Sequence, residues 1–166
     1  MRFYLKILVV FIFLFCSANA DDKNSVNKWS LYSGTFDFSD EGAKSTLYGV
    51  QYINLVSHYD SFLGKLHPVT GFFLTVDNAK YIYKGFQTTY DKGSFNITPS
   101  FTPGLYDKGD GKDLRHVVEF KTEIQISYNI SEKSEIAFSY NHISNANLGD
   151  NNPGANSYMF NFSKKF

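Results

Sequence analysis

Strict alternation of apolar and polar residues constrains the fold of this chain most, and it is clearest in "RHVVEFKTEIQISYNI", residues 115–130. From Val118 onward every second residue except Thr122 is apolar, whereas Glu119 and the residues that follow it in step are polar. Successive side chains of a β-strand point to opposite faces, so the pattern predicts a long strand with one apolar and one charged face.

Turn-forming residues divide the chain into eight such segments, and helical spacing is hard to find in any of them. The segments are 28–38, 45–57, 67–77, 80–90, 93–105, 115–130, 133–144 and 156–166, and the longest polar break surrounds residues 106–113. Two all-β architectures fit. A soluble lipocalin-like barrel turns its apolar faces inward, whereas a transmembrane barrel turns them outward to lipid. The alternation alone does not choose between them.

The start of the chain reads as a secretory signal peptide. Arg2 and Lys6 precede an apolar run over residues 7–15, and small residues lead up to Ala20. This layout predicts cleavage after Ala20 and export of residues 21–166 as one domain.

The end of the chain favours the membrane barrel. Phe166 is preceded at even spacing by Phe162, Phe160 and Tyr158, a pattern that resembles the C-terminal assembly signal of bacterial outer-membrane proteins. Segments of roughly 10 residues also suit a tilted bilayer crossing. We therefore expect an eight-stranded antiparallel transmembrane β-barrel in the outer membrane of a Gram-negative-type cell. An interior of this size is filled by side chains, and the charged face of residues 119–125 should form pairs there.

Composition excludes several functions. The single cysteine, Cys16, lies in the predicted signal peptide, so the mature chain has neither a disulfide nor a catalytic thiolate. Loss of Arg2 and Lys6 leaves 14 basic against 16 acidic residues, a net charge of −2 that does not favour nucleic-acid binding. The histidines outside residue 142 show no metal-ligand spacing, and no cofactor is predicted.

The stretch "YNHISNANLGDNNPGANSY", residues 140–158, carries the candidate site. Parity places His142 and Ser144 on the apolar face of the seventh strand, and Asn156 shares the apolar parity of the last strand. The turn between these antiparallel strands should bring the three side chains together at one rim. Polar groups beside lipid cost free energy, which favours a substrate that lies in the membrane, although a rim is also where ordinary polar residues occur.

The same stretch resembles the signature of the PagL-type lipid A 3-O-deacylases, a family of eight-stranded outer-membrane barrels. The motif His-x-Ser-Asn-Ala reads His142 to Ala146 here, followed by "NNPG" on the way to the last strand. The likeness extends over about residues 118–166, and the first two thirds resemble the family only in strand pattern. It implies an esterase that removes an acyl chain from the lipid A of lipopolysaccharide without a cofactor, with Ser144 as nucleophile and His142 as base.

One position departs from the family. Asn156 stands where the family usually has a glutamate that orients the histidine. An amide can still accept a hydrogen bond from the imidazole, but it cannot stabilise the imidazolium by charge. We expect a working pair oriented by Asn156, while recruitment of Asp150 or loss of activity stays open. The oxyanion is assigned to Asn145 or to the backbone N–H groups of Gly149 and Gly154.

Two other functions remain open from the sequence: a non-enzymatic structural or adhesion barrel with a degenerate site, and a soluble exported lipid-binding barrel. A homodimer also remains open as the oligomeric state.

Overall fold

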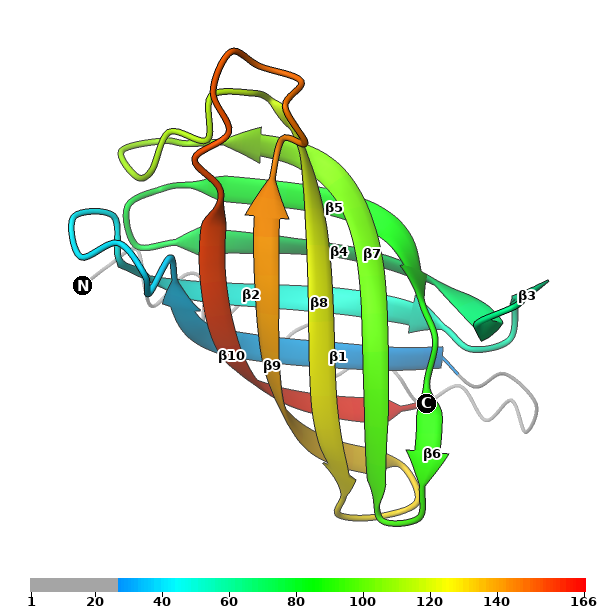
Figure 1. The fold of residues 1–166 in the computed structure, drawn as a ribbon. Helices are drawn as coiled ribbons and strands as arrows, with labels where there is room; N and C mark the ends of the chain where they lie inside the picture. The colour runs from blue at the N-terminus through cyan, green and yellow to red at the C-terminus, as the bar shows by residue number, and fades with distance from the viewer. Residues whose placement is uncertain (1–26) are drawn as a thin grey trace.

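The computed structural model describes residues 27–166, and within them the predicted strands close into a barrel (Figure 1). The predicted signal peptide, residues 1–20, lies outside the described residues. Eight long strands form the wall: β1 (Asn27–Phe36), β2 (Ser45–Asn54), β4 (Gly64–Thr75), β5 (Lys80–Gln87), β7 (Phe95–Asp107), β8 (Val118–Asn129), β9 (Ser134–Ser144) and β10 (Ala155–Lys165). Neighbours are antiparallel, and β1 pairs with β10 to close the cylinder. No helix long and apolar enough to cross a membrane occurs in the described part of the chain.

The eight predicted strands are therefore confirmed, with differences at their ends. Two short strands, β3 (Tyr59–Ser61) and β6 (Tyr90–Lys92), extend hairpins beyond the wall by pairing with β4 and β7. The predicted segment 115–130 begins its strand only at Val118. Arg115 has a left-handed φ of 69°, and its N–H donates to Asp113 Oδ1 at 2.8 Å, so the chain turns there before it can extend.

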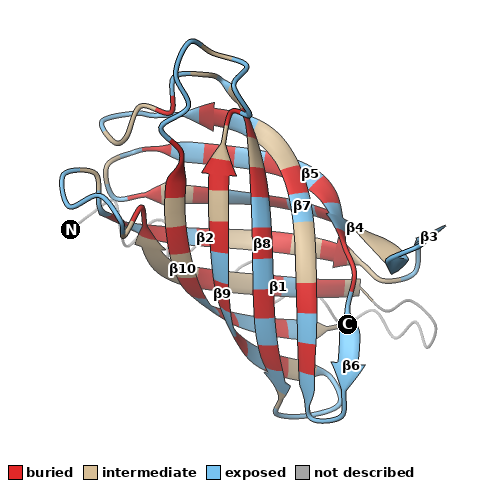
Figure 2. Ribbon diagram, viewed as in Figure 1, coloured by how far each residue is buried: buried red, intermediate tan, exposed pale blue. Residues whose placement is uncertain are grey.

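The wall is apolar outside and polar inside, as a membrane barrel requires. Along β8, Ile124, Ile126 and Tyr128 are exposed, whereas Glu123, Gln125 and Ser127, which alternate with them, are buried. Figure 2 shows this alternation as red and blue bands along the strands. The outward band belongs against lipid, and the soluble lipocalin-like barrel is excluded.

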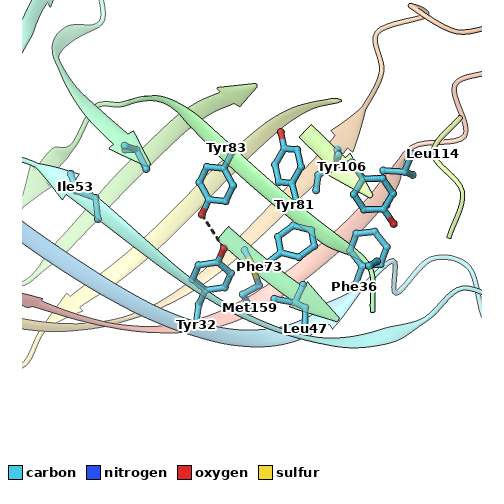
Figure 3. Packing of buried hydrophobic residues seen from close by; sticks show 14 residues of the cluster. Tyr32, Phe36, Leu47, Ile53, Phe73, Tyr81, Tyr83, Tyr106, Leu114 and Met159 are labelled. Atoms are coloured by element: carbon cyan, nitrogen blue, oxygen red, sulfur yellow. Dashed lines mark hydrogen bonds between the residues drawn. The ribbon is translucent and has the colours of Figure 1, made fainter. Parts of the chain in front are cut away.

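The two ends of the barrel differ. At the end that carries the loops 37–44, 76–79, 108–117 and 145–154, called the loop end below, the interior is packed with aromatic and aliphatic side chains (Figure 3). Tyr32 and Tyr83 meet across this interior with their hydroxyl oxygens 2.9 Å apart. Toward the end that carries Asn27 and Lys165, the interior is polar and opens into a cavity of about 620 Å³, which Lys28 and Glu135 help to line.

Charges inside the wall are paired with one exception. Lys28 Nζ lies 2.8 Å from Glu135 Oε1, and Lys121 Nζ lies 2.8 Å from Glu123 Oε2. Glu119 is fully buried, and neither of its carboxyl oxygens has a hydrogen-bond partner among the described residues. The expectation that every charge on this face would be paired is therefore wrong for Glu119, because the neighbouring side chains at the loop end are mostly aromatic or aliphatic.

Candidate active site

The candidate site lies on the last two strands, β9 and β10, where they reach the loop end. His142 and Asn156 are direct partners in the antiparallel register, so their side chains project from the same face. The residues that precede His142 at even spacing, Phe138 and Tyr140, are exposed, whereas Asn141 and Ile143 are buried. His142 and Ser144 thus lie on the outward parity of β9, at the loop end of the exposed apolar band.

His142 and Asn156 are joined by a hydrogen bond. The distance from His142 Nδ1 to Asn156 Oδ1 is 2.8 Å, and the Tyr140 hydroxyl donates to the same oxygen at 2.7 Å. The structure therefore brings the predicted base into contact with the residue that was expected to orient it. Tyr140, one step earlier on the outward face, was not singled out from the sequence.

Ser144 lies two residues beyond His142 on the same face and is half-buried. Within residues 27–166, neither Ser144 Oγ nor His142 Nε2 has a hydrogen-bond partner within 3.5 Å. Both groups are therefore unengaged by other side chains in the described part of the chain. Contacts between a serine and a histidine base often tighten only when a substrate is bound.

Gly154 supports the histidine from the neighbouring loop. It adopts a left-handed φ of 60°, and a Cβ at this position would lie 2.9 Å from His142 Cε1. The missing side chain lets the imidazole lie directly against the loop backbone. Gly154, which the sequence offered as an oxyanion donor, is thus placed where it fixes the histidine ring.

Asn145 and Gly149 hold the loop 145–154 against the loop 108–117. The Asn145 amide donates to Leu114 O at 2.9 Å and to Asn151 O at 2.8 Å. Its own backbone N–H donates to Asn152 Oδ1 at 3.0 Å. A Cβ at Gly149 would lie 3.2 Å from Arg115 O, so this glycine permits the close approach of the two loops. The donors of Asn145 are therefore already engaged in the structure.

The residues directly after Asn145 have an uncommon backbone conformation. Ala146 and Asn147 both adopt left-handed φ angles, 52° and 62°. The Asn147 N–H donates back to Asn145 Oδ1 at 2.9 Å, while the Ala146 N–H has no partner among the residues that the structure describes. This N–H lies two residues after Ser144 in the chain, and no pattern in the sequence predicts that it lacks a partner.

A buried carboxylate stands behind Asn156. Asp37, at the end of β1, accepts hydrogen bonds at Oδ1 from the Asn156 N–H (3.2 Å) and the Ser39 hydroxyl (3.1 Å). Its other oxygen pairs with Lys112. Ser39 Oγ in turn accepts from Asn156 Nδ2 at 3.1 Å. Barrel closure brings these residues together, although Asp37 and Asn156 are 119 positions apart in the chain.

Other polar groups near the loop end do not join the site. Asp150 is exposed, and within the described residues it makes no hydrogen bond to His142. The part of the chain that the structure describes also holds no group of three or more His, Cys, Asp or Glu side chains arranged around a metal ion. What the site can offer is an imidazole with a free Nε2, a hydroxyl beside it and a backbone N–H nearby, the parts of a serine-type acyl transfer.

Comparison with known proteins identifies a family for this chain and several solved structures that share its barrel fold. A family model described as lipid A 3-O-deacylase (PagL) matches residues 27–165. Among solved structures, the outer membrane enzyme PagL superposes with a TM-score of 0.62 at 16% sequence identity, covering 82% of this chain and 98% of that chain. Comparison with curated protein sequences gives no significant match.

Two further structures share the architecture at lower identity. De novo designed transmembrane β-barrels superpose with a TM-score of 0.56 at 9% identity, covering 89% of this chain and 100% of that chain. Neisserial surface protein A superposes with a TM-score of 0.51 at 10% identity, covering 85% of this chain and 96% of that chain. At these identities the likeness shows the fold alone. Neither the fold nor the family match supports the homodimer that the sequence left open.

Proposed function

Because the chain belongs to the lipid A 3-O-deacylase (PagL) family, an outer-membrane barrel family, we propose that it is an esterase that removes an ester-linked acyl chain from the lipid A of lipopolysaccharide. The observation that carries the proposal is the hydrogen bond of 2.8 Å between His142 Nδ1 and Asn156 Oδ1, on the outward face beside Ser144. A structural barrel gains nothing from an oriented imidazole at the edge of its lipid-facing band.

The position of the site suits a substrate that lies in the membrane. In outer-membrane barrels the longer loops face the cell exterior and the apolar band contacts lipid. His142 and Ser144 follow Phe138 and Tyr140 along that band and lie at its loop-end edge, which supports a site near the level where acyl chains join a headgroup. An acyl ester of lipid A can reach it from the outer leaflet without entering the barrel.

The proposed chemistry requires one tautomer of His142. In the tautomer whose Nδ1–H donates to Asn156 Oδ1, 2.8 Å away, the lone pair of Nε2 can accept the proton of the Ser144 hydroxyl. His142 takes the hydroxyl proton as Ser144 Oγ attacks the ester carbonyl carbon, and it returns that proton to the sugar oxygen as the ester C–O bond breaks. Water then cleaves the acyl-serine by the same steps, and a free fatty acid is released.

The developing oxyanion needs a donor that is not otherwise engaged. The N–H of Ala146 meets this requirement within the described residues and lies two positions from Ser144. Asn145, the donor expected from the sequence, supports this arrangement indirectly, because its amide bonds to Leu114 and Asn151 hold the loop that carries Ala146.

The test is direct. The mature chain, refolded into detergent micelles, is incubated with lipopolysaccharide, and the lipid A is followed by mass spectrometry for loss of one hydroxyacyl chain. We expect loss with the natural chain and none with Ser144→Ala. If the correctly folded natural chain releases no acyl group, it is the non-enzymatic barrel with a degenerate site that the glutamate-to-asparagine departure also allows.

A further inference from the structure

With Asn156 beside His142, the position of the proton on the imidazole is not fixed by the partner alone, as it would be with a glutamate. A carboxylate only accepts hydrogen bonds, so it compels the histidine nitrogen facing it to carry a proton. An amide has an oxygen and an NH₂ group of the same shape. If Asn156 turned its NH₂ group toward His142 Nδ1, the proton would have to sit on Nε2, and the imidazole could not accept a proton from Ser144.

The contacts on the two sides of Asn156 Oδ1 do not decide between these arrangements. His142 is a donor or an acceptor at Nδ1 according to its tautomer. The Tyr140 hydroxyl, 2.7 Å from the same amide atom, can rotate to donate or to accept. Any decision must come from the other side of the amide.

We propose that Asp37 sets the proton position on His142, acting through Ser39 and Asn156 as a positioning residue for the proposed hydrolysis. The Asp37 carboxylate can only accept, so the single proton of the Ser39 hydroxyl, 3.1 Å away, is donated to it. Ser39 Oγ is left to accept at its lone pairs, and the group 3.1 Å away on Asn156 must be the NH₂. The oxygen of the amide then faces His142, and Nδ1 carries the proton.

The carboxyl group that starts this chain is buried beside a cationic partner. The Asp37 side chain is 1% exposed, and the Lys112 side chain, which is 13% exposed, pairs with its second oxygen through the ammonium group. The backbone N–H of Asn156 donates to the first oxygen at 3.2 Å. A buried carboxylate that pairs with a cation and accepts a hydrogen bond from an N–H group is stabilised in that position. It still acts only as a hydrogen-bond acceptor toward Ser39.

The segment that carries Asp37 and Ser39 is fixed against the site. Phe38, between them, donates its N–H to Asn156 O at 2.9 Å. Its ring lies 5.3 Å from that of Tyr158 and 6.2 Å from that of Tyr140. The hydrogen-bond chain is therefore part of a packed rim, and its direction is set before a substrate arrives. Together Asp37, Ser39 and Asn156 set the tautomer of His142, as one glutamate in place of Asn156 would, but they place no negative charge in direct contact with the imidazole.

The first experiment reads the tautomer without turnover. ¹⁵N-histidine-labelled protein in micelles is examined by NMR, with the His142 imidazole signals assigned from a His142→Gln variant. We expect the natural chain to carry the proton on Nδ1. Asp37→Asn keeps the shape and tolerates the left-handed φ of 46° at this position, but it makes the chain ambiguous and should give a mixture of tautomers. Ser39→Ala removes the middle of the chain, leaves the pair of Asp37 with Lys112 intact, and should have the same effect.

Kinetics then separate positioning from folding. Each variant should lower kcat for acyl release by roughly 10- to 100-fold while KM changes by less than about twofold, a smaller loss than the ~10⁴-fold cost of an acid-to-amide change in direct contact with a catalytic histidine. Asp40→Asn is the matched control, because Asp40 contacts Lys112 at 3.5 Å but takes no part in the chain through Ser39. It should leave both the tautomer and kcat unchanged.

A double variant shows whether Asp37 acts through the orientation of the Asn156 amide. In an Asn156→Glu background an acceptor-only group faces His142 directly, so the addition of Asp37→Asn should cost less than about twofold. A natural tautomer and kcat in folded Asp37→Asn or Ser39→Ala overturns the proposal, and so does an equal loss in the Asn156→Glu background. If the tautomer responds as expected but the natural chain releases no acyl group, the proposed function fails and the positioning role stands.

Discussion

His142 Nδ1 and Asn156 Oδ1 lie 2.8 Å apart across the β9–β10 ladder, where the two residues are direct partners. The contact orients the imidazole, but it places no negative charge beside it, since the partner is an amide. In a serine-type acyl transfer the histidine becomes an imidazolium, which a neighbouring carboxylate would stabilise. The His142 ring is therefore well oriented, while the positive charge that it would acquire has no carboxylate in direct contact, and this combination has measurable consequences.

Removal of either member of the proposed pair should abolish hydrolysis. We expect His142→Ala and Ser144→Ala each to lower the rate of acyl release by about 10⁴-fold or more. Both side chains lie on the outer face, so the barrel should fold normally, which is checked by comparing the electrophoretic mobility of unheated and boiled samples with that of the natural chain. Full activity in either folded variant would show that the residues are assigned wrongly.

Restoring the acid should accelerate the enzyme. Asn156→Glu places a carboxylate against His142 Nδ1 and stabilises the imidazolium, and we expect kcat to rise by about tenfold, or ~1.4 kcal/mol of barrier. Asn156→Gln lengthens the side chain equally without adding charge and is the control. A gain in both variants would point to length rather than charge, and a gain in neither would mean that charge is already supplied from elsewhere.

The contact of Gly154 with the histidine ring should also matter for the rate. A methyl group there would lie 2.9 Å from His142 Cε1 and must push the ring aside. A displacement of about 1 Å can cost on the order of 10²-fold in rate, so Gly154→Ala should lower kcat by that amount.

A second glycine separates this effect from backbone strain. Gly93 has a φ of 77° but no atom within 4 Å of its Cβ position, and it lies at the opposite end of the barrel. Gly93→Ala should lose a similar ~1–2 kcal/mol of stability from the left-handed backbone and keep full activity. If both variants lose activity equally, the contact with His142 is irrelevant.

The unpaired carboxyl inside the wall should limit stability. Glu119 is fully buried and its oxygens have no partner among the described residues. Glu119→Leu should therefore raise the free energy of unfolding by about 1–3 kcal/mol, measured by urea titration in micelles.

A charged neighbour in the same strand gives the opposite expectation. Glu123→Leu leaves Lys121 without the carboxylate that lies 2.8 Å from it, and should cost about 3–5 kcal/mol. Destabilisation by Glu119→Leu would mean instead that the natural carboxyl is satisfied, for example by bound water.

The sequence predicted the strands of the wall, and which side chains share a face, because both depend on a period of two. Once β9 and β10 are adjacent strands, the parity of His142, Ser144 and Asn156 places them on one face without knowledge of any other contact. The same reasoning placed Ile124 and Glu123 on opposite faces, whereas the outward direction of the apolar face was inferred from the aromatic pattern that leads to Phe166.

What the sequence could not provide depends on contacts between distant segments. Asp37 reaches Asn156 only because β1 closes on β10, and parity says nothing about where a loop residue after a strand will turn. The engagement of the Asn145 amide depends on Leu114, which lies 31 positions earlier in another loop. Glu119 was expected to find a partner, and only the packing of the loop end shows that it has none among residues 27–166.

The aromatic filling of the loop end has a mechanical consequence. Ile143 and Ala155 point inward and are direct partners in the register, one step from His142 and Asn156, and both are buried within that filling. The strands that carry the proposed reacting groups are therefore supported from behind by packed side chains. The same side chains fill the space that a solute would need to cross, so within the described residues the barrel is a closed body at the loop end and not a channel.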